Sequence, residues 1–398
     1  MSAEMTMMKL APAPVIKPWG LAHGEARSIT GIRVGLGELW LASTQTGPGN
    51  YASEITEPAV DRDLAEILTE AAEEGEDALL PFLGEQPLRT LRENPHRGKT
   101  EAWHVRSACG RAGFAAGPRT EEQRRELQEL ITGPGLSARI QDWPPEVRDL
   151  FGLIEPVEEG AVYMVPAGTL HTMFAIGEES RLIIDEIQQG YGESRLPTLS
   201  KILLVQDSLL SVQVHPTDAT VRAVAEGTKQ VDQDLESNPT VRLYDFGRRP
   251  GEYPELGFEL TDPTAGLRRV EPVDVALDEG AELRVLVACE FFVKSRLTLE
   301  AGAEVDRQPT FGSYRVIHCI EGSADLLARD SQCCLEKGET VLVPAALEED
   351  LSVRTENGCR LFDDAVPSVP DLRAFLSEAG ADETALDGLF DPPRALDE

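Results

Sequence analysis

The segment "LSVQVHPTDA" (210–219) places a glutamine and a histidine two residues apart among apolar and β-branched neighbours. Because successive side chains of a strand point to opposite faces, Ser211, Gln213 and His215 share one face. Burying an amide and an imidazole without partners costs several kcal/mol. We therefore expect this polar row to face either solvent or a polar cavity.

Two other segments carry groups that could meet this row. In "GKTEAWHV", strand alternation puts Glu101 on the same face as Lys99 and Trp103. In "VPAGTLH", His171 follows a predicted tight turn. Together with the row, these segments offer two neutral imidazoles, one carboxylate and one amide oxygen. That donor set suits Zn²⁺, and Mn²⁺, Co²⁺ or Fe²⁺ would also be accepted.

The elements that must position these residues are mainly short strands. "TGIRVGLGELWLAS", "GAVYMVPAGTLHTMFAI" and "KILLVQDSLLSVQVH" show strand patterns broken by turn residues. Helical spacing over about 62–80 and 119–155 predicts helical insertions in the N-terminal half. The sequence therefore predicts a mainly β protein, a barrel or sandwich decorated by helices.

A second β-domain is expected after about residue 275, where helical patterns give way to repeated strand-turn-strand segments. Its phrase "KGETVLVPAAL" echoes "EEGAVYMVPAGTL" upstream, but only the upstream copy carries a histidine after the Pro-Ala turn. We therefore predict a metal-binding domain over 1–275 and a metal-free, related barrel over 276–366. The acidic remainder, 367–398, is expected to be a short helix and a loose tail.

Charge limits the choice of partner. Lys plus Arg total 37 and Asp plus Glu total 70 among 398 residues, a formal net charge of −33. This acidic excess argues against nucleic acid or an anionic membrane as a partner. An anionic substrate would have to be held by a few local Lys and Arg residues through charge-assisted hydrogen bonds.

Targeting signals and cysteine spacing indicate a cellular compartment. The sequence contains no apolar run typical of a signal peptide or a membrane-spanning helix. Its six cysteines form no Cys-x-x-Cys pair, which favours free thiols in a reducing environment. We therefore expect a cytoplasmic protein. The sequence gives no expectation about its oligomeric state.

Several segments resemble those of one enzyme family. "IKPWG", "GELWLAS", "GKTEAW", "VPAGTLH", "EIQQ", "LSVQVHP" and "VRLYDFGR" resemble the characteristic segments of type I phosphomannose isomerases, which are zinc-dependent cupin proteins. The match spans about 16–250. The resemblance implies two cupin-like (jelly-roll) barrels and one Zn²⁺ per chain, with the metal held by Gln213, His215, Glu101 and His171.

The same resemblance implies a reaction, the interconversion of mannose 6-phosphate and fructose 6-phosphate through an enediol. It assigns the substrate phosphate to Ser211, Lys201 and Arg242. It also assigns Lys99 to the substrate oxygens and Glu186 to an acidic position in the pocket. A hexose phosphate is therefore the expected small-molecule partner.

The sequence departs from the family pattern in two ways. In family members "QVHP" precedes the K-x-E segment, whereas here it follows "EIQQ", as though one hairpin had moved along the chain. If the moved strands fill the same slot in the barrel, the same ligands can still meet. The second departure concerns the catalytic base, because Gly192 and Asn238 stand where relatives carry aspartate. The neighbouring residues Glu193 and Glu236 could restore the carboxylate, and we assign the role to Glu193.

Two other functions fit parts of this pattern. A cupin oxygenase would hold Fe²⁺ with two histidines and one carboxylate, but the glutamine and the phosphate-type cations count against it. A non-catalytic sugar-phosphate-binding cupin would keep the metal and lack the base. Arg242 and Lys201 could also be ordinary surface ion pairs.

The remaining histidines and two tryptophans have structural interpretations. His104 falls on the strand face opposite Glu101, and no pattern gives the other three histidines partners. Trp19 and Trp40 are predicted to pack in the core near the barrel mouth. The histidines interpreted as structural are His23, His96, His104 and His318.

Overall fold

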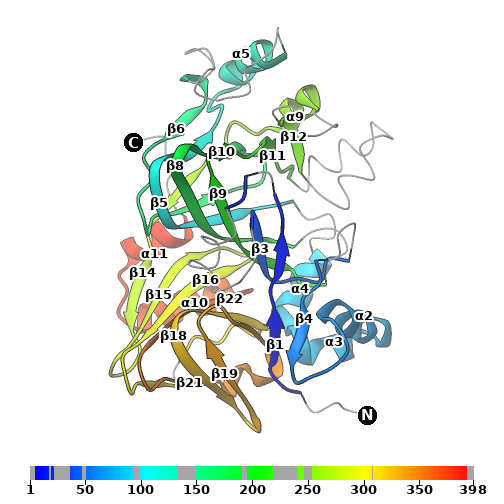
Figure 1. Cartoon of the computed structure of the whole chain (residues 1–398), viewed down its shortest axis with the longest axis vertical. Helices are drawn as coiled ribbons and strands as arrows, with labels where there is room; N and C mark the ends of the chain where they lie inside the picture. The colour runs from blue at the N-terminus through cyan, green and yellow to red at the C-terminus, as the bar shows by residue number, and fades with distance from the viewer. Residues whose placement is uncertain are drawn as a thin grey trace.

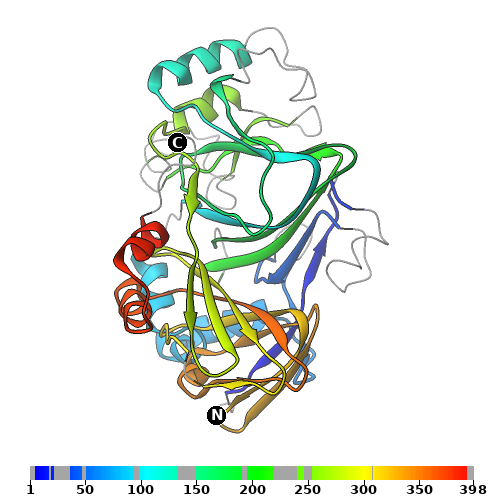
Figure 2. The same cartoon turned by 90° about the vertical axis from the view of Figure 1, so that its left-hand side faces the viewer.

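The structure is a computed structural model, and Figures 1 and 2 show two β-barrels arranged along the long axis of the molecule. Each barrel is built on an eleven-stranded sheet. The mainly β fold predicted from the sequence is confirmed. The structure describes residues 5–17, 19–21, 36–46, 51–93, 98–132, 149–190, 195–217, 220, 240–245, 253–306 and 308–391.

The first sheet runs in the order β13-β7-β5-β8-β9-β3-β2, with β6, β10, β11 and β12 pairing beside it. Strands β5 and β8 are unusually long, at 16 and 20 residues, and pair antiparallel over much of that length. They form the wall of the first barrel (Figure 2). The strands of this sheet are β2 (Ala13–Val15), β3 (Glu38–Ala42), β5 (Glu101–Ala116), β6 (Gly152–Ile154), β7 (Val162–Val165), β8 (Leu170–Gln189), β9 (Thr198–Gln206), β10 (Ser208–Leu209), β11 (Val212–Val214), β12 (Val241–Tyr244) and β13 (Arg268–Val270).

The second sheet runs in the order β14-β15-β16-β22-β18-β20-β1-β4, with β17, β19 and β21 beside it. Most of its strands come from the C-terminal third of the chain. Its strands are β14 (Val273–Ala276), β15 (Ala281–Ala288), β16 (Val293–Leu299), β17 (Glu304–Val305), β18 (Arg315–Ala328), β19 (Ser331–Glu336), β20 (Thr340–Val343), β21 (Ser352–Arg354), β22 (Cys359–Ala365), β1 (Met8–Ala11) and β4 (Glu54–Glu57).

The N-terminal strand β1 belongs to this second sheet, which a division of the chain at residue 275 does not anticipate. It pairs antiparallel with β20, with Met8 opposite Leu342 and Leu10 opposite Thr340. Met8 and Leu10 are buried while Lys9 lies between them on the other face. The chain then enters β2, which pairs with β3 in the first sheet. Residues 8–15 therefore join both barrels (Figure 1).

Helices lie at the edges of the barrels. The first predicted insertion extends further than expected, through three helices that end at Glu93. The second is partly wrong, because residues 152–154 form strand β6, whose pairing with β5 satisfies its backbone. The helices are α2 (Leu64–Glu74), α3 (Glu76–Leu83), α4 (Glu85–Glu93), α5 (Glu121–Thr132), α9 (Pro254–Leu260), α10 (Val369–Glu378), α11 (Glu383–Phe390) and a 3₁₀ helix, Ala345–Asp350.

The C-terminal segment contains two helices over residues 369–390, where the sequence predicts a short helix and a loose tail. Helices α10 and α11 pack their leucines into the core of the second barrel, and Leu372, Leu376, Leu386 and Leu389 are all buried there. Asp382 caps α11 by accepting a hydrogen bond from the Ala385 amide at 2.8 Å. The acidic residues of these two helices, Asp371, Glu378, Glu383 and Asp387, lie on their exposed faces. Within the described part of the chain, no helix is long and apolar enough to cross a membrane.

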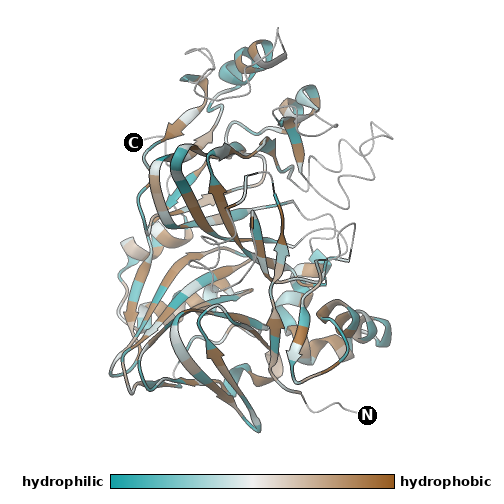
Figure 3. Ribbon diagram, in the orientation of Figure 1, coloured by the Kyte–Doolittle hydropathy of each residue, from teal (hydrophilic) through white to brown (hydrophobic). Residues whose placement is uncertain are grey.

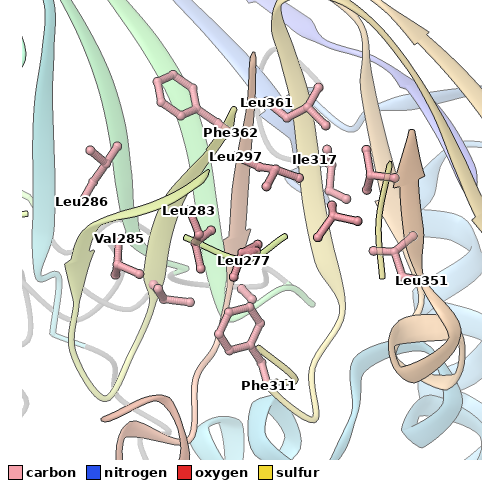
Figure 4. Close-up of a cluster of buried hydrophobic side chains, with 14 of the residues drawn as sticks. Leu277, Leu283, Val285, Leu286, Leu297, Phe311, Ile317, Leu351, Leu361 and Phe362 are labelled. Atoms are coloured by element: carbon pink, nitrogen blue, oxygen red, sulfur yellow. The ribbon is translucent and has the colours of Figure 1, made fainter. Parts of the chain in front are cut away.

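The interior of the second barrel is filled with aliphatic and aromatic side chains. Figure 4 shows Leu283, Leu297, Ile317 and Leu361 pointing inward from neighbouring strands. Brown and teal stretches alternate along the strands of both barrels and on the helices, as expected for elements that bury one face (Figure 3). This barrel is therefore a packed body against which β1 and the C-terminal helices are held.

The docking of α11 gives a stability prediction. Replacing the fully buried Leu386 by alanine should lower the free energy of unfolding by about 2–5 kcal/mol, because the residual cavity adds to the lost burial. Urea unfolding followed by circular dichroism measures this. Leu130→Ala, at a position 37% exposed on α5, is the control and should change stability little. Equal effects of the two substitutions would show that α11 is not part of the core.

Candidate active site

Four side chains predicted to bind metal come together in the first barrel. Glu101 begins β5, His171 lies near the start of β8, Gln213 lies on β11 and His215 follows it. The His215 Nε2 atom is 3.2 Å from Glu101 Oε1, and His171 Nε2 is 3.8 Å from Glu101 Oε2. The Gln213 amide nitrogen is 3.3 Å from His171 Nε2 and 3.4 Å from His215 Nε2.

Strand pairing explains this convergence despite the changed order of the motifs. Strand β11 pairs antiparallel with β8, which sets Gln213 directly opposite His171. The Gly168 amide in the Pro-Ala-Gly turn donates a hydrogen bond to the His215 carbonyl at 2.6 Å. Gly168 has a φ of +91°, a conformation that favours glycine. The moved hairpin therefore brings its glutamine and histidine to the other two groups.

The faces predicted by strand alternation are confirmed. Val212 and Val214 are fully buried in an apolar cluster, while Ser211 and Gln213 line the cavity. Lys99, Glu101 and Trp103 line it as well, from β5 and the residues before it. The polar row thus faces a lined cavity inside the barrel and not open solvent.

Hydrogen bonds orient both imidazoles. His171 Nδ1 donates to the Thr169 carbonyl at 2.9 Å, which fixes the tautomer whose Nε2 lone pair points at Glu101. His215 Nδ1 lies 3.2 Å from the Thr240 hydroxyl. Partners of this kind commonly hold metal-binding imidazoles in place. Each ring therefore presents Nε2 to the centre of the cluster.

Gln213 is held by a neighbour on its own face. The Ser211 hydroxyl donates to Gln213 Oε1 at 2.9 Å, and the amide nitrogen faces the imidazoles. A half-turn of the amide end would exchange the two atoms and offer oxygen to the cluster. The side chain therefore lies within reach of the centre and needs only a local rotation to act as an oxygen donor.

The electrostatics of the cluster favour metal-binding protonation states. Burial raises the pKa of Glu101, but the adjacent Lys99 ammonium and His215 outweigh it and hold that pKa well below its usual range. Burial and Lys99 lower the pKa of His215 to about 3. Burial likewise lowers the pKa of His171. Near neutral pH the cluster therefore holds one carboxylate and two neutral imidazoles, as a divalent cation requires.

A second pair of charges lies beside this cluster. Lys201 Nζ is 2.9 Å from Glu186 Oε1, and both side chains are buried. Burial and the negative charge of Glu101 raise the pKa of Glu186 to about 7, although Lys201 opposes the shift. Lys99 forms an ion pair with Glu101 and lies 3.3 Å from His215 Nε2. Glu186 is therefore a carboxyl group able to take up or release a proton near neutral pH.

One cavity contains most of the residues named from the sequence. The predicted site residues that line it are Lys99, Glu101, His171, Glu186, Lys201, Ser211, Gln213 and Arg242. His215 is buried behind this lining and reaches the cluster through Nε2. Glu193 lies outside the described residues, as do Gly192, Glu236 and Asn238.

The cavity also contains charged residues that the sequence analysis did not single out. Lys17 and Glu38 form a 3.2 Å ion pair, and Glu38 accepts a hydrogen bond from Trp40 Nε1 at 2.8 Å. Trp19 and Trp40 are buried, as predicted, and also line the cavity. All four residues lie in "IKPWG" and "GELWLAS", two of the segments that carry the family resemblance, so the sequence could have identified them as cavity residues.

The histidines interpreted as structural lie elsewhere wherever the structure describes them. His104 Nδ1 is 3.0 Å from Asp185 Oδ2 on the outer face of β5. His318 Nδ1 is 3.0 Å from the Thr340 hydroxyl in the second barrel, so it has a partner that its sequence pattern did not reveal. His23 and His96 lie outside the described residues. All six cysteines are free thiols.

Comparisons with known proteins agree with the resemblance seen in the sequence, although no family model matches this chain. A Bacillus subtilis (strain 168) protein named "Putative mannose-6-phosphate isomerase YvyI" is 22% identical over 298 residues, which cover 73% of this chain and 72% of that protein. The crystal structure of mannose 6-phosphate isomerase from Bacillus subtilis superposes with a TM-score of 0.55 at 18% identity, covering 90% of this chain and 99% of that one.

A single-residue variant of phosphomannose isomerase from Salmonella typhimurium gives a similar result. Its crystal structure superposes with a TM-score of 0.53 at 14% identity, covering 91% of this chain and 100% of that one. Both superpositions extend over the two barrels and not over one alone. The fold of this chain is therefore that of the phosphomannose isomerases.

Proposed function

We propose that this protein is a metal-dependent mannose-6-phosphate isomerase that interconverts mannose 6-phosphate and fructose 6-phosphate. The observation that carries the proposal is the buried cluster of Glu101, His171 and His215 with Gln213, whose ligand atoms lie close together in one polar cavity. The shared fold of the phosphomannose isomerases supports the same activity. The substrate is small and anionic, which suits a cavity that contains three lysines and one arginine.

The donor set favours zinc. Glu101, His171, His215 and Gln213 supply one carboxylate, two neutral imidazoles and one amide, a combination suited to a borderline cation. The hydrogen bonds of the two imidazoles to Thr169 and Thr240 support this role. When bound, such a cation orients the oxygens on C1 and C2 and stabilises the negative charge that develops on them.

The reaction needs one proton to leave C2 and one to reach C1. A base removes the C2 proton, which leaves an enediolate with its negative charge on the C1 oxygen; the proton on the C2 oxygen then passes to the C1 oxygen, and delivery of a proton to C1 leaves the C2 carbonyl of the ketose. We assign the base to Glu193, and the carboxyl of Glu186 is poised to exchange protons between the oxygens. Lys99 would donate a hydrogen bond to a substrate oxygen. Lys99 and Glu186 line the same cavity as the proposed metal ligands.

Ser211, Lys201 and Arg242 would bind the substrate phosphate. Arg242 lines the cavity from β12, where it pairs with Gln213 of β11. A guanidinium donates paired hydrogen bonds to phosphate oxygens in one plane. Lys201 already has Glu186 as an anionic partner, so phosphate binding would share that lysine between two anions. The sugar would then extend from the phosphate group toward the metal cluster.

A cytoplasmic enzyme of carbohydrate metabolism fits the remaining observations. The six free thiols suit a reducing compartment. Neither alternative function explains the cavity as fully. An iron oxygenase does not need Lys201 and Arg242 in its cavity, and a binding protein does not need the carboxyl of Glu186.

The metal cluster gives the first functional prediction. Zinc-loaded protein should convert mannose 6-phosphate in a coupled assay, and a chelator should abolish conversion until zinc is restored. His215→Ala should weaken metal binding by about 100-fold or more, since it removes a ligand, and should abolish turnover. His318→Ala, also a buried histidine but in the second barrel, is the matched control and should keep both properties.

Two outcomes would contradict this prediction in different ways. Full turnover by His215→Ala would remove the cluster from the reaction. A wild-type protein that binds metal and hexose phosphate, yet exchanges no solvent deuterium at C2, would be the non-catalytic binding protein.

The phosphate assignment gives a second prediction. Arg242→Ala should raise KM for mannose 6-phosphate by about 10- to 100-fold, the loss expected for charge-assisted hydrogen bonds, and leave the metal content unchanged. Arg242→Lys should recover part of the loss because it keeps the charge without the planar fork. Arg354→Ala, on β21 of the other barrel, serves as the control. An unchanged KM in Arg242→Ala would refute the assignment.

A further inference from the structure

A second cavity lies between the two barrels, away from the candidate active site. The first barrel contributes His104 and Arg106 of β5 and the turn that contains Glu159. The second contributes Arg296 of β16 and Arg360 and Phe362 of β22. The cleft has a volume of about 500 Å³, which is within the range of small-molecule sites. It shares no lining residue with the first cavity.

The charge of this cleft is opposite to that of the chain. Four cations line it together with two carboxylates, Glu159 and Glu321, and a third carboxylate, Asp185, binds Arg106 from behind the lining. The protein as a whole has a formal charge of −33. A local excess of cations in so acidic a chain creates a positive site that attracts small anions. The four cations are Arg106, Arg296, Lys337 and Arg360.

Arg296 lines the cleft, and one of its N–H groups donates no hydrogen bond within the described part of the chain. Its Nε is buried without a hydrogen-bond partner among the described residues. In the strand ladder it stands directly opposite Arg284 of β15 and next to Phe362 of β22. Like charges directly opposite one another destabilise a sheet, and Asp274, 3.5 Å from Arg284, offsets part of that repulsion. Burial and the charges of Arg284 and Arg360 lower the pKa of Arg296, although Asp274 and Glu282 oppose the shift.

The other cations are held so that they could meet the same ligand. Arg106 donates through Nε to Asp185 Oδ2 at 3.0 Å and through Nη2 to Asp185 Oδ1, which fixes its guanidinium at the edge of β5. Arg360 pairs with Glu321, but both side chains are about half exposed. An exposed pair of this kind contributes little and can exchange its carboxylate for a ligand. The cleft is therefore lined by one arginine held in place, Arg106, and by another that can exchange its partner, Arg360.

We propose that this cleft between the barrels binds a phosphate-bearing small molecule at a site separate from the active site. Phosphate is favoured over a carboxylate because several cations converge on one small volume and a phosphate group brings about two charges. Guanidinium groups also match its oxygens through paired donors.

The two sites are linked by the strands they share. On β5, Glu101 and Trp103 face the first cavity while His104 and Arg106 face the cleft. On β8, Glu186 faces inward and the adjacent Asp185 binds Arg106 on the outer face. A ligand in the cleft would therefore contact the outer face of β5 directly and β8 through the Arg106–Asp185 pair.

The test uses inorganic phosphate as the probe and calorimetry on the full-length protein. Arg242→Ala is introduced first, so that binding in the active site is suppressed and remaining binding reports on the cleft. We expect Arg242→Ala protein to bind phosphate still, and the added Arg296→Ala change to weaken that binding about tenfold or more. The added control Arg329→Ala, an exposed arginine paired with Asp350 elsewhere in the second barrel, should not weaken it.

A second measurement locates the site and does not depend on the variants folding. Hydrogen exchange of the wild-type protein with and without phosphate should show protection of 104–106 and 360–362. The proposal is overturned if phosphate protects neither segment, or if Arg242→Ala alone removes all phosphate binding. It is also overturned if Arg296→Ala binds phosphate as tightly as Arg329→Ala does in the same background. None of these readouts requires isomerase activity, so failure of the proposed function would be seen separately.

Discussion

The antiparallel pairing of β8 with β5 and with β11 is the constraint on which the candidate active site depends. One partner begins with Glu101, the other carries Gln213 and leads to His215, and β8 itself supplies His171. A shift of either pairing by one residue would turn a ligand out of the cavity, because neighbouring strand residues face opposite sides. The apolar burial of Val212 and Val214 opposes such a shift. The core of the barrel thus determines where its polar groups lie.

The concentration of buried charge in the first barrel is stable only because each group has a partner. Lys99 accompanies Glu101, Lys201 accompanies Glu186, and Lys17 accompanies Glu38. Removing one member of such a pair leaves an uncompensated buried charge, which costs more than the intact pair contributes. The three pairs also bring lysines to a cavity within a very acidic chain. The three lysines therefore neutralise the buried carboxylates and also supply the positive charge that an anionic substrate needs.

Much of the site could be predicted from the sequence because it depends on local rules. Strand alternation gave the correct faces for Glu101 and Gln213, and the Pro-Ala-Gly turn correctly preceded His171. Pairing between distant strands could not be read in this way. The place of β1 in the second sheet depends on β20 more than 300 residues later, and "MKLA" alone carries no sign of that partner. The packing of α11 was likewise missed, because its acidic outer face hides buried leucines.

The N-terminal strand also sets an order of events during synthesis. Strand β1 leaves the ribosome first, but its partner β20 begins at Thr340, so their pairing must wait until most of the chain has been made. Its other neighbour in the sheet, β4, is close in sequence and can pair early. In the nascent chain, β1 and β4 can therefore form a two-stranded ribbon in which the other edge of β1 stays unpaired until β20 has been synthesised. When β20 pairs with β1, the free edge of β1 is covered. Because the next strand, β2, pairs with β3 in the first sheet, the same segment then connects the two barrels.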